Sequence, residues 1–210
     1  SLKPSVLVES GADWLCYGMG ERTMLEFTKA IEAGRNINDI RKIPQLGFYM
    51  DGRCRTKDAV ILNSYERSCK DKVAFAENFH VVETYANMQN PPVLVEPVGN
   101  GYVQINPTWP PATQEEMDSF WDLPYTKLPH PRYKGKHIPA FEMIKFSVNT
   151  HRGCFGGCNF CTIAAHQGKF IQSRSEESIL KEIAALNRLP GFAGNISDVG
   201  APTANMYGMR

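Results

Sequence analysis

The cysteine segment THRGCFGGCNFC, residues 150–161, constrains this chain more than any other stretch. Three residues separate Cys154 from Cys158 and two separate Cys158 from Cys161, so one loop can converge three sulfurs on a small inorganic centre. Thiolates are the ligands of iron–sulfur clusters and of soft or borderline metals. The glycines at positions 153, 156 and 157 give the loop a backbone without side-chain bulk. The pattern predicts a thiolate-bound metal centre.

The number of cysteines separates two kinds of metal centre. A cluster that only transfers electrons normally has four cysteine ligands, whereas three ligands leave one iron open. An open coordination position is what a metal uses to bind a substrate, as in catalytic zinc sites. A structural zinc site is the alternative, with His151 or His166 as the fourth ligand. Three unrelated structural cysteines are a further alternative, although such cysteines usually lie among apolar residues and this loop is glycine-rich and polar.

Composition and charge exclude several partners. The formal net charge of +1 gives no electrostatic indication of a nucleic-acid partner. No apolar run reaches about 18 residues, so neither a membrane span nor a membrane partner is expected. The N-terminus has no charged region followed by an apolar stretch, so no secretory leader is expected. With three cysteines committed to one loop, a reducing cytoplasm is the expected compartment.

Apolar periodicity and turn residues predict an α/β fold for the first two thirds of the chain. Residues 93–96 and 102–105 flank Gly99-Asn100-Gly101, which predicts a hairpin whose alternating second strand has one solvated face. Ser68 and Asp71 predict the start of a helix whose apolar face includes Val73, Phe79 and Val82. The other predicted elements are helices at 4–9 and 21–33, strands at 14–17, 48–50 and 59–62, and a capped helix from Thr113 to Trp121.

The last third of the chain predicts one β-α-β unit. Residues 143–148 form an apolar strand that delivers the cysteine segment at its carboxyl end, where functional loops lie in parallel α/β barrels. Ser173 and Glu176 predict the start of a helix. Its apolar face comprises Ile179, Leu180, Ile183 and Leu186, and a second strand follows at 196–199. Strand, helix and parallel strand are the repeating element of a barrel.

Several segments resemble the YgiQ-type family of radical S-adenosylmethionine (radical SAM) proteins. They are residues 11–13 with 17–21, 150–161, 166–168, 172–178 and 198–206. The resemblance covers nearly the whole chain and is densest over residues 146–206. It implies the end of an N-terminal α/β domain, residues 1–139, followed by the first β-α-β unit of an incomplete parallel radical SAM barrel, residues 140–210.

The resemblance also implies a cofactor site. By it, Cys154, Cys158 and Cys161 ligate three irons of a [4Fe-4S] cluster, and the fourth iron binds S-adenosylmethionine. An electron from a reducing donor then cleaves S-adenosylmethionine to methionine and a 5′-deoxyadenosyl radical, which abstracts hydrogen from a substrate that the sequence does not identify. The implied cofactor-binding residues are Phe160 near the adenine, Asp198, which orients the turn beneath the adenine, and Gly200, Ala201 and Pro202 in that turn, which follows the second strand.

Other residues near the cysteines carry expectations of their own. His151, Arg152, His166 and Gln167 flank the loop and are candidates for hydrogen bonds to cluster or cofactor. An alanine at position 201 would be strained if the turn required a glycine with positive φ there. No residue is predicted as a catalytic acid or base. The alternative function is a zinc-stabilised binding module without catalysis.

Length predicts a fragment. The 67 residues from Ile144 to Arg210 leave room for about two strands and one helix, because a βα unit of a barrel takes roughly 30 residues. Most of the barrel is therefore expected beyond Arg210. We expect the isolated chain to be inactive, to retain at best a defective cluster loop, and to self-associate through exposed core.

Overall fold

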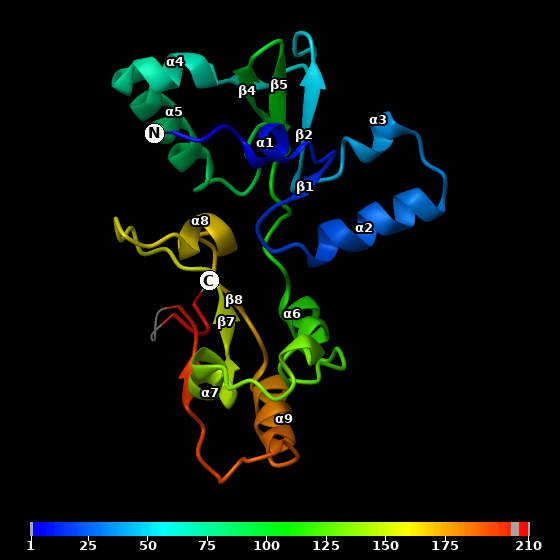
Figure 1. Ribbon diagram of the computed structural model, residues 1–210, viewed down its shortest axis with the longest axis vertical. Helices are drawn as coiled ribbons and strands as arrows, with labels where there is room; N and C mark the ends of the chain where they lie inside the picture. Colours follow the sequence, from blue (N-terminus) through cyan, green and yellow to red (C-terminus); the bar gives the residue numbers. More distant parts are fainter. Residues whose placement is uncertain (1, 203–205, 210) are drawn as a thin grey trace. The chain divides into compact units, whose positions relative to one another are not determined.

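The computed structural model describes residues 2–202 and 206–209, which divide into two compact units at residues 110 and 111 (Figure 1). The two units are described separately. The division at residues 139 and 140, which the sequence predicts for the domains of the whole protein, stays a prediction.

The first unit is an α/β fold around a mixed sheet with strand order β1-β2-β5-β4-β3. Neighbouring strands are antiparallel except β3 and β4, which are parallel. The elements are α1 (Val6–Ser10), β1 (Leu15–Cys16), α2 (Glu21–Glu32), α3 (Ile37–Ile40), β2 (Leu46–Asp51), β3 (Val60–Ile61), α4 (Tyr65–Lys70), α5 (Lys72–Tyr85), β4 (Leu94–Val98) and β5 (Gly101–Ile105).

The predicted hairpin is confirmed, but its solvated face is not. Strands β4 and β5 pair across the turn at Gly99, whose φ of 57° lies in the left-handed region. Tyr102 and Gln104, expected to face solvent, are only 5% and 6% exposed. Strand β5 lies between β2 and β4 in the sheet, and side chains on both of its faces are buried, so packing covers the face that was expected to be solvated. The Gln104 amide is satisfied there, since it accepts from Thr56 Oγ1 at 2.8 Å and donates to Asn106 Oδ1 at 2.9 Å.

The predicted helix start at Ser68 is wrong. Ser64 caps α4 and Asp71 caps α5, so Ser68 lies inside α4, where its side chain is buried. The apolar face expected to be buried on α5 is exposed, with Val73 at 66% and Phe79 at 60%. A polar residue turns inward instead. Asn78 accepts from the Asn63 N–H at 2.8 Å and donates to the Asn63 carbonyl at 2.9 Å and to Ser68 Oγ at 3.1 Å.

The second unit contains the predicted β-α-β arrangement. Strands β6 (Ser147–Asn149) and β9 (Asp198–Gly200) are parallel neighbours, and α9 (Glu176–Leu186) connects them. Ile179 and Leu186 of α9 pack with Val148 of β6 in a buried cluster. The remaining elements are α6 (Gln114–Trp121), the 3₁₀ turn η1 (Pro131–Tyr133), α7 (Pro139–Ile144), β7 (His151–Arg152), α8 (Ile163–Gln167) and β8 (Gln172–Ser173).

Three details of this unit differ from the sequence expectation. The first strand is shorter than predicted, because Met143 and Ile144 belong to α7, where they are exposed. Ser175, and not Ser173, caps α9 by accepting from the Ser178 N–H at 3.1 Å. Leu180 is 63% exposed, so the buried face of α9 is narrower than its apolar periodicity predicts.

The described residues thus confirm an α/β fold. None of their helices combines the length and the apolar run that crossing a membrane requires.

Replacing the inward-facing amide of α5 tests how this helix is held. We expect Asn78→Ala to lower the free energy of unfolding by roughly 1–3 kcal/mol, because the Asn63 N–H and carbonyl lose their partners. Asn87→Ala is the matched control, since the Asn87 side chain donates only to the Glu83 carbonyl at the exposed end of the helix. Chemical denaturation monitored by circular dichroism measures both. Equal effects of the two substitutions would contradict this account of α5.

Candidate cofactor site

The cysteine loop begins at the carboxyl end of a parallel strand pair. Asn149 of β6 lies opposite Gly200 of β9, and the Thr150 N–H donates to the Gly200 carbonyl at 2.8 Å. The loop that contains Cys154 and the turn that follows β9 therefore emerge at the same end of the pair. This is the arrangement that the sequence predicted from the β-α-β unit.

A short antiparallel ladder closes the base of the loop. Strand β7 pairs with β8, which places His151 opposite Ser173. Beyond the ladder, the Gly153 N–H donates to Gln167 Oε1 at 3.1 Å and the Cys154 N–H donates to the Gly168 carbonyl at 3.1 Å. The sequence reasoning missed this ladder, because two-residue strands carry too little periodicity to be detected.

Only glycine fits at the base of the loop. Gly153 has a φ of 91°, which L-amino acids rarely adopt. A Cβ at this position would lie 2.1 Å from the Phe170 carbonyl oxygen. The close approach of the two chain segments therefore depends on the missing side chain.

The three cysteines differ in exposure. Cys154 is buried, whereas Cys158 and Cys161 are exposed. A Cβ built on Gly156 would lie 3.4 Å from Cys154 Sγ and 3.8 Å from Cys158 Sγ, so these two sulfurs border a space that a side chain at position 156 would fill. A tight turn follows, in which the Cys161 N–H donates to the Cys158 carbonyl at 3.0 Å.

The thiolate set and the glycine gap suit a metal centre bound by the loop. Within residues 2–202 and 206–209, however, no three histidine, cysteine or carboxylate side chains are already grouped to hold a metal ion. The donors are thus present in one loop without being assembled.

The two histidines proposed as zinc ligands occupy different surroundings. His151 is 2% exposed, its Nδ1 lies 2.9 Å from Thr150 Oγ1, and its Nε2 has no hydrogen-bond partner. Burial lowers the pKa of His151, which favours the neutral imidazole. His166 lies in the short helix α8, where its N–H donates to the Thr162 carbonyl.

A buried arginine that the sequence reasoning passed over anchors the strand before the loop. Arg174 is 1% exposed and donates to the Asn149 carbonyl at 2.7 Å and to Ser178 Oγ at 2.9 Å. Its guanidinium forms an ion pair with Glu182 and lies 4.8 Å from the centroid of the Trp121 ring. The guanidinium of Arg152 lies 4.7 Å from the same ring. Arg174 belongs to one of the segments that carry the family resemblance, which is the signal that could have identified it.

Ala201, in the turn after β9, has no left-handed backbone strain. Among the described residues, only Gln45, Asp58 and Lys127 combine a side chain with positive φ, so the strain considered for Ala201 is absent. The Asp198 carboxylate lies beside Gly200, because a Cβ built on Gly200 would lie 3.7 Å from Asp198 Oδ1. Ala201 and Pro202 are half-buried, and residues 203–205 lie outside the described part of the chain. Phe160 is 91% exposed at the tip of the cysteine loop.

Similar proteins agree with the resemblance seen in the sequence. A UPF0313 protein of Bacteroides thetaiotaomicron is 47% identical to this chain, and the match covers all of the chain and 36% of that protein. The UPF0313 protein YgiQ of Escherichia coli is 36% identical, again over all of the chain and 36% of that protein. A UPF0313 protein of Methanocella arvoryzae is 44% identical over 98% of the chain and 34% of that protein. No solved structure matches the chain.

The chain spans about a third of the length of these curated relatives. The family described as radical SAM N-terminal matches residues 1–147, which end just before the cysteine loop. This match covers well over half of the chain, and the chain therefore belongs to the radical SAM N-terminal family.

Proposed function

We propose that the complete protein containing this chain is a radical SAM enzyme in which Cys154, Cys158 and Cys161 hold a [4Fe-4S] cluster. Membership of the radical SAM N-terminal family supports the reaction class. The observation that carries the proposal is the placement of three cysteines in one loop at the carboxyl end of β6, with the sulfurs of Cys154 and Cys158 both within 3.8 Å of a Cβ built on Gly156. When bound, such a cluster supplies the electron that cleaves S-adenosylmethionine to methionine and a 5′-deoxyadenosyl radical.

In this proposal the turn after β9 binds the methionyl end of S-adenosylmethionine. The Gly200 carbonyl already accepts from the Thr150 N–H, so the carbonyls of Ala201 and Pro202 are the acceptors we assign to the ammonium group. Pro202 has no N–H, which leaves only acceptors at that position. The Asp198 carboxylate beside Gly200 adds a favourable negative charge. Phe160, exposed at the loop tip, is available to pack against the adenine.

The residues at the base of the loop have a positioning role. Gln167 and Gly168 at the end of α8 accept hydrogen bonds from the backbone of Gly153 and Cys154, which positions the first cysteine of the loop. Pre-positioned ligands reduce the ordering cost of binding a metal. The substrate and the electron donor are not specified by these residues. The reducing cytoplasm that the thiolates require is part of the proposal.

The cysteine assignment is tested by metal content and by cofactor cleavage. In the complete protein, reconstituted anaerobically with iron and sulfide, we expect Cys154→Ala, Cys158→Ala and Cys161→Ala each to lose the cluster absorbance and the release of 5′-deoxyadenosine. Cys69→Ala is the matched control, because Cys69 is an exposed cysteine outside the loop. The variants should keep the far-ultraviolet circular dichroism of the wild type.

Zinc is the outcome that would overturn the assignment. A colourless protein with stoichiometric zinc and no release of 5′-deoxyadenosine would favour the metal-stabilised module instead. In that case Cys154→Ala should also unfold the protein, since structural zinc contributes directly to folding.

Alanine substitutions at two glycines of the loop test whether cluster binding depends on the backbone conformation of the loop. Gly153→Ala should abolish cluster binding, because the left-handed backbone alone costs about 1–2 kcal/mol and the new Cβ collides with the Phe170 carbonyl. Gly157→Ala should retain the cluster, since a Cβ there meets no atom within 4 Å and φ is not left-handed. Iron and sulfide analysis after reconstitution measures both. Loss of iron in both variants would show that the loop does not hold this geometry when loaded.

A further inference from the structure

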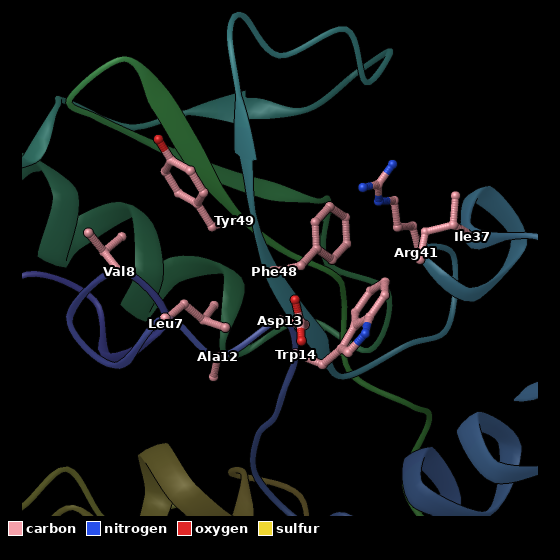
Figure 2. Close-up of a pocket in the computed structure, with 10 residues that line it drawn as sticks. Leu7, Val8, Ala12, Asp13, Trp14, Ile37, Arg41, Phe48 and Tyr49 are labelled. Carbon is pink, nitrogen blue, oxygen red and sulfur yellow. The ribbon is translucent and has the colours of Figure 1, made fainter.

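A pocket of about 690 Å³ opens in the first unit, apart from the residues assigned to the cofactor (Figure 2). It forms where β1 ends. Strand β1 pairs only with Leu46 and Gly47 of β2. Among the described residues, the rest of β2 therefore has no strand partner along this edge. The segment from α1 to Trp14 forms one wall, Ile37 and Arg41 form another, and Phe48 and Tyr49 of β2 lie between them. Its volume is within the range typical of small-molecule sites.

Most of the lining is apolar and held rigidly. Leu7 and Phe48 are each 2% exposed, so the core fixes their side chains. The Trp14 and Phe48 rings meet edge to face with centroids 5.6 Å apart. Val8 and Ile37 are partly exposed along the rim. This surface suits the apolar body of a small ligand.

Arg41 supplies a cation with unused hydrogen-bonding capacity. Its Nε is buried against the protein without a hydrogen-bond partner, so a ligand in the pocket can reach only the terminal guanidinium nitrogens, and within the described chain the guanidinium forms no ion pair. The guanidinium lies 5.6 Å from the centroid of the Phe48 ring. The backbone of Arg41 is fixed, because its carbonyl accepts from Asn106 Nδ2 at 2.7 Å. An anion that reaches the terminal N–H groups would gain charge-assisted hydrogen bonds that no described residue supplies.

The charge pattern selects the kind of anion. A guanidinium presents its N–H groups as a planar fork that matches carboxylate and phosphate oxygens. Asp13 lines the same pocket, and among the described residues its carboxylate forms no ion pair. Its negative charge repels a dianion more strongly than a monoanion. A carboxylate is therefore favoured over a phosphate ester.

We propose that this pocket binds a small free monocarboxylate with an apolar body, whose carboxylate pairs with Arg41 and whose body lies against Trp14, Phe48 and Leu7. The site is distinct from the cysteine loop and does not rest on the proposed radical chemistry.

Three probes of matched size test the proposal by isothermal titration calorimetry on the complete protein. They are 3-phenylpropionate, its neutral isostere 3-phenylpropanol, and phenyl phosphate. We expect 3-phenylpropionate to bind about tenfold or more tightly than either other probe, since a charged hydrogen bond is worth about one decade in affinity or more. Equal binding of the alcohol, tighter binding of the phosphate, or no binding of 3-phenylpropionate would each overturn it. Absence of binding would overturn the proposal even if the cause were that another part of the complete protein fills the pocket.

Variants separate the role of the charge from a loss of structure. Arg41→Gln should weaken 3-phenylpropionate by about tenfold or more and leave 3-phenylpropanol unchanged, while Arg41→Lys should give an intermediate loss because the fork is absent. Arg35→Gln removes an exposed arginine outside the pocket and should change neither affinity. If Arg41→Gln weakened acid and alcohol equally, the arginine would only support the pocket wall and the proposal would fail. Metal content is unaffected in every arm, so the outcome is independent of the cluster assignment.

Discussion

The buried guanidinium of Arg174 is the constraint on which the second unit depends. It connects the carboxyl end of β6, through the Asn149 carbonyl, to α9, through Ser178, and Glu182 supplies the compensating charge. Removing one partner of such a buried pair typically costs about 3–5 kcal/mol, because the other charge is left without compensation. The direction in which the chain leaves β6 is thereby fixed. Because the cysteine loop begins there, the position of any metal centre bound by its sulfurs depends on this chain direction.

The first unit uses buried polar side chains for a comparable purpose. Asn106 donates to the carbonyls of both Arg41 and Ile43 at 2.7 Å, which ties the chain that follows α3 to the end of β5. Gln104 and Thr56 extend this network across the sheet. The pocket wall that presents Arg41 is therefore supported by hydrogen bonds from the interior. Buried networks of this kind fix one arrangement, because every member needs its partner.

Sequence patterns predicted the elements with strong local signals. The capping box of Thr113 and Glu116, the hairpin at Gly99 and the β-α-β unit all follow from residues close together in the chain. The failures in predicting which side chains are buried share one physical cause, which is that burial depends on distant partners. Tyr102 and Gln104 alternate like residues of a half-solvated strand, yet side chains from elsewhere in the chain cover both, as the contact of Thr56 with Gln104 shows. The periodicity of α5 does not reveal that Asn78, and not Phe79, turns inward.

For the candidate site, too, local sequence signals predicted only the part that lies within one short segment. The cysteine spacing placed three candidate ligands in one loop, and the structure adds the ladder and the Gly153 contact that close its base. The buried environment of Arg174 could not be derived from composition, because an arginine in a polar segment is usually solvated. The pocket at Arg41 gave no sequence signal, since its lining comes from three separate segments of the chain.

The way in which α5 is attached has a consequence for local motion. The helix is secured by the amide of Asn78 together with the small Ala74 side chain, while Phe79 and Val73 already face solvent. Detaching it would therefore expose Ala74 and the covered parts of Val81 and Tyr85, and little other apolar surface. Amide hydrogens of this helix should then exchange through an opening whose free energy hardly changes with denaturant concentration, unlike the amides of β2 and β5. We therefore expect α5 to open separately from the sheet of the first unit.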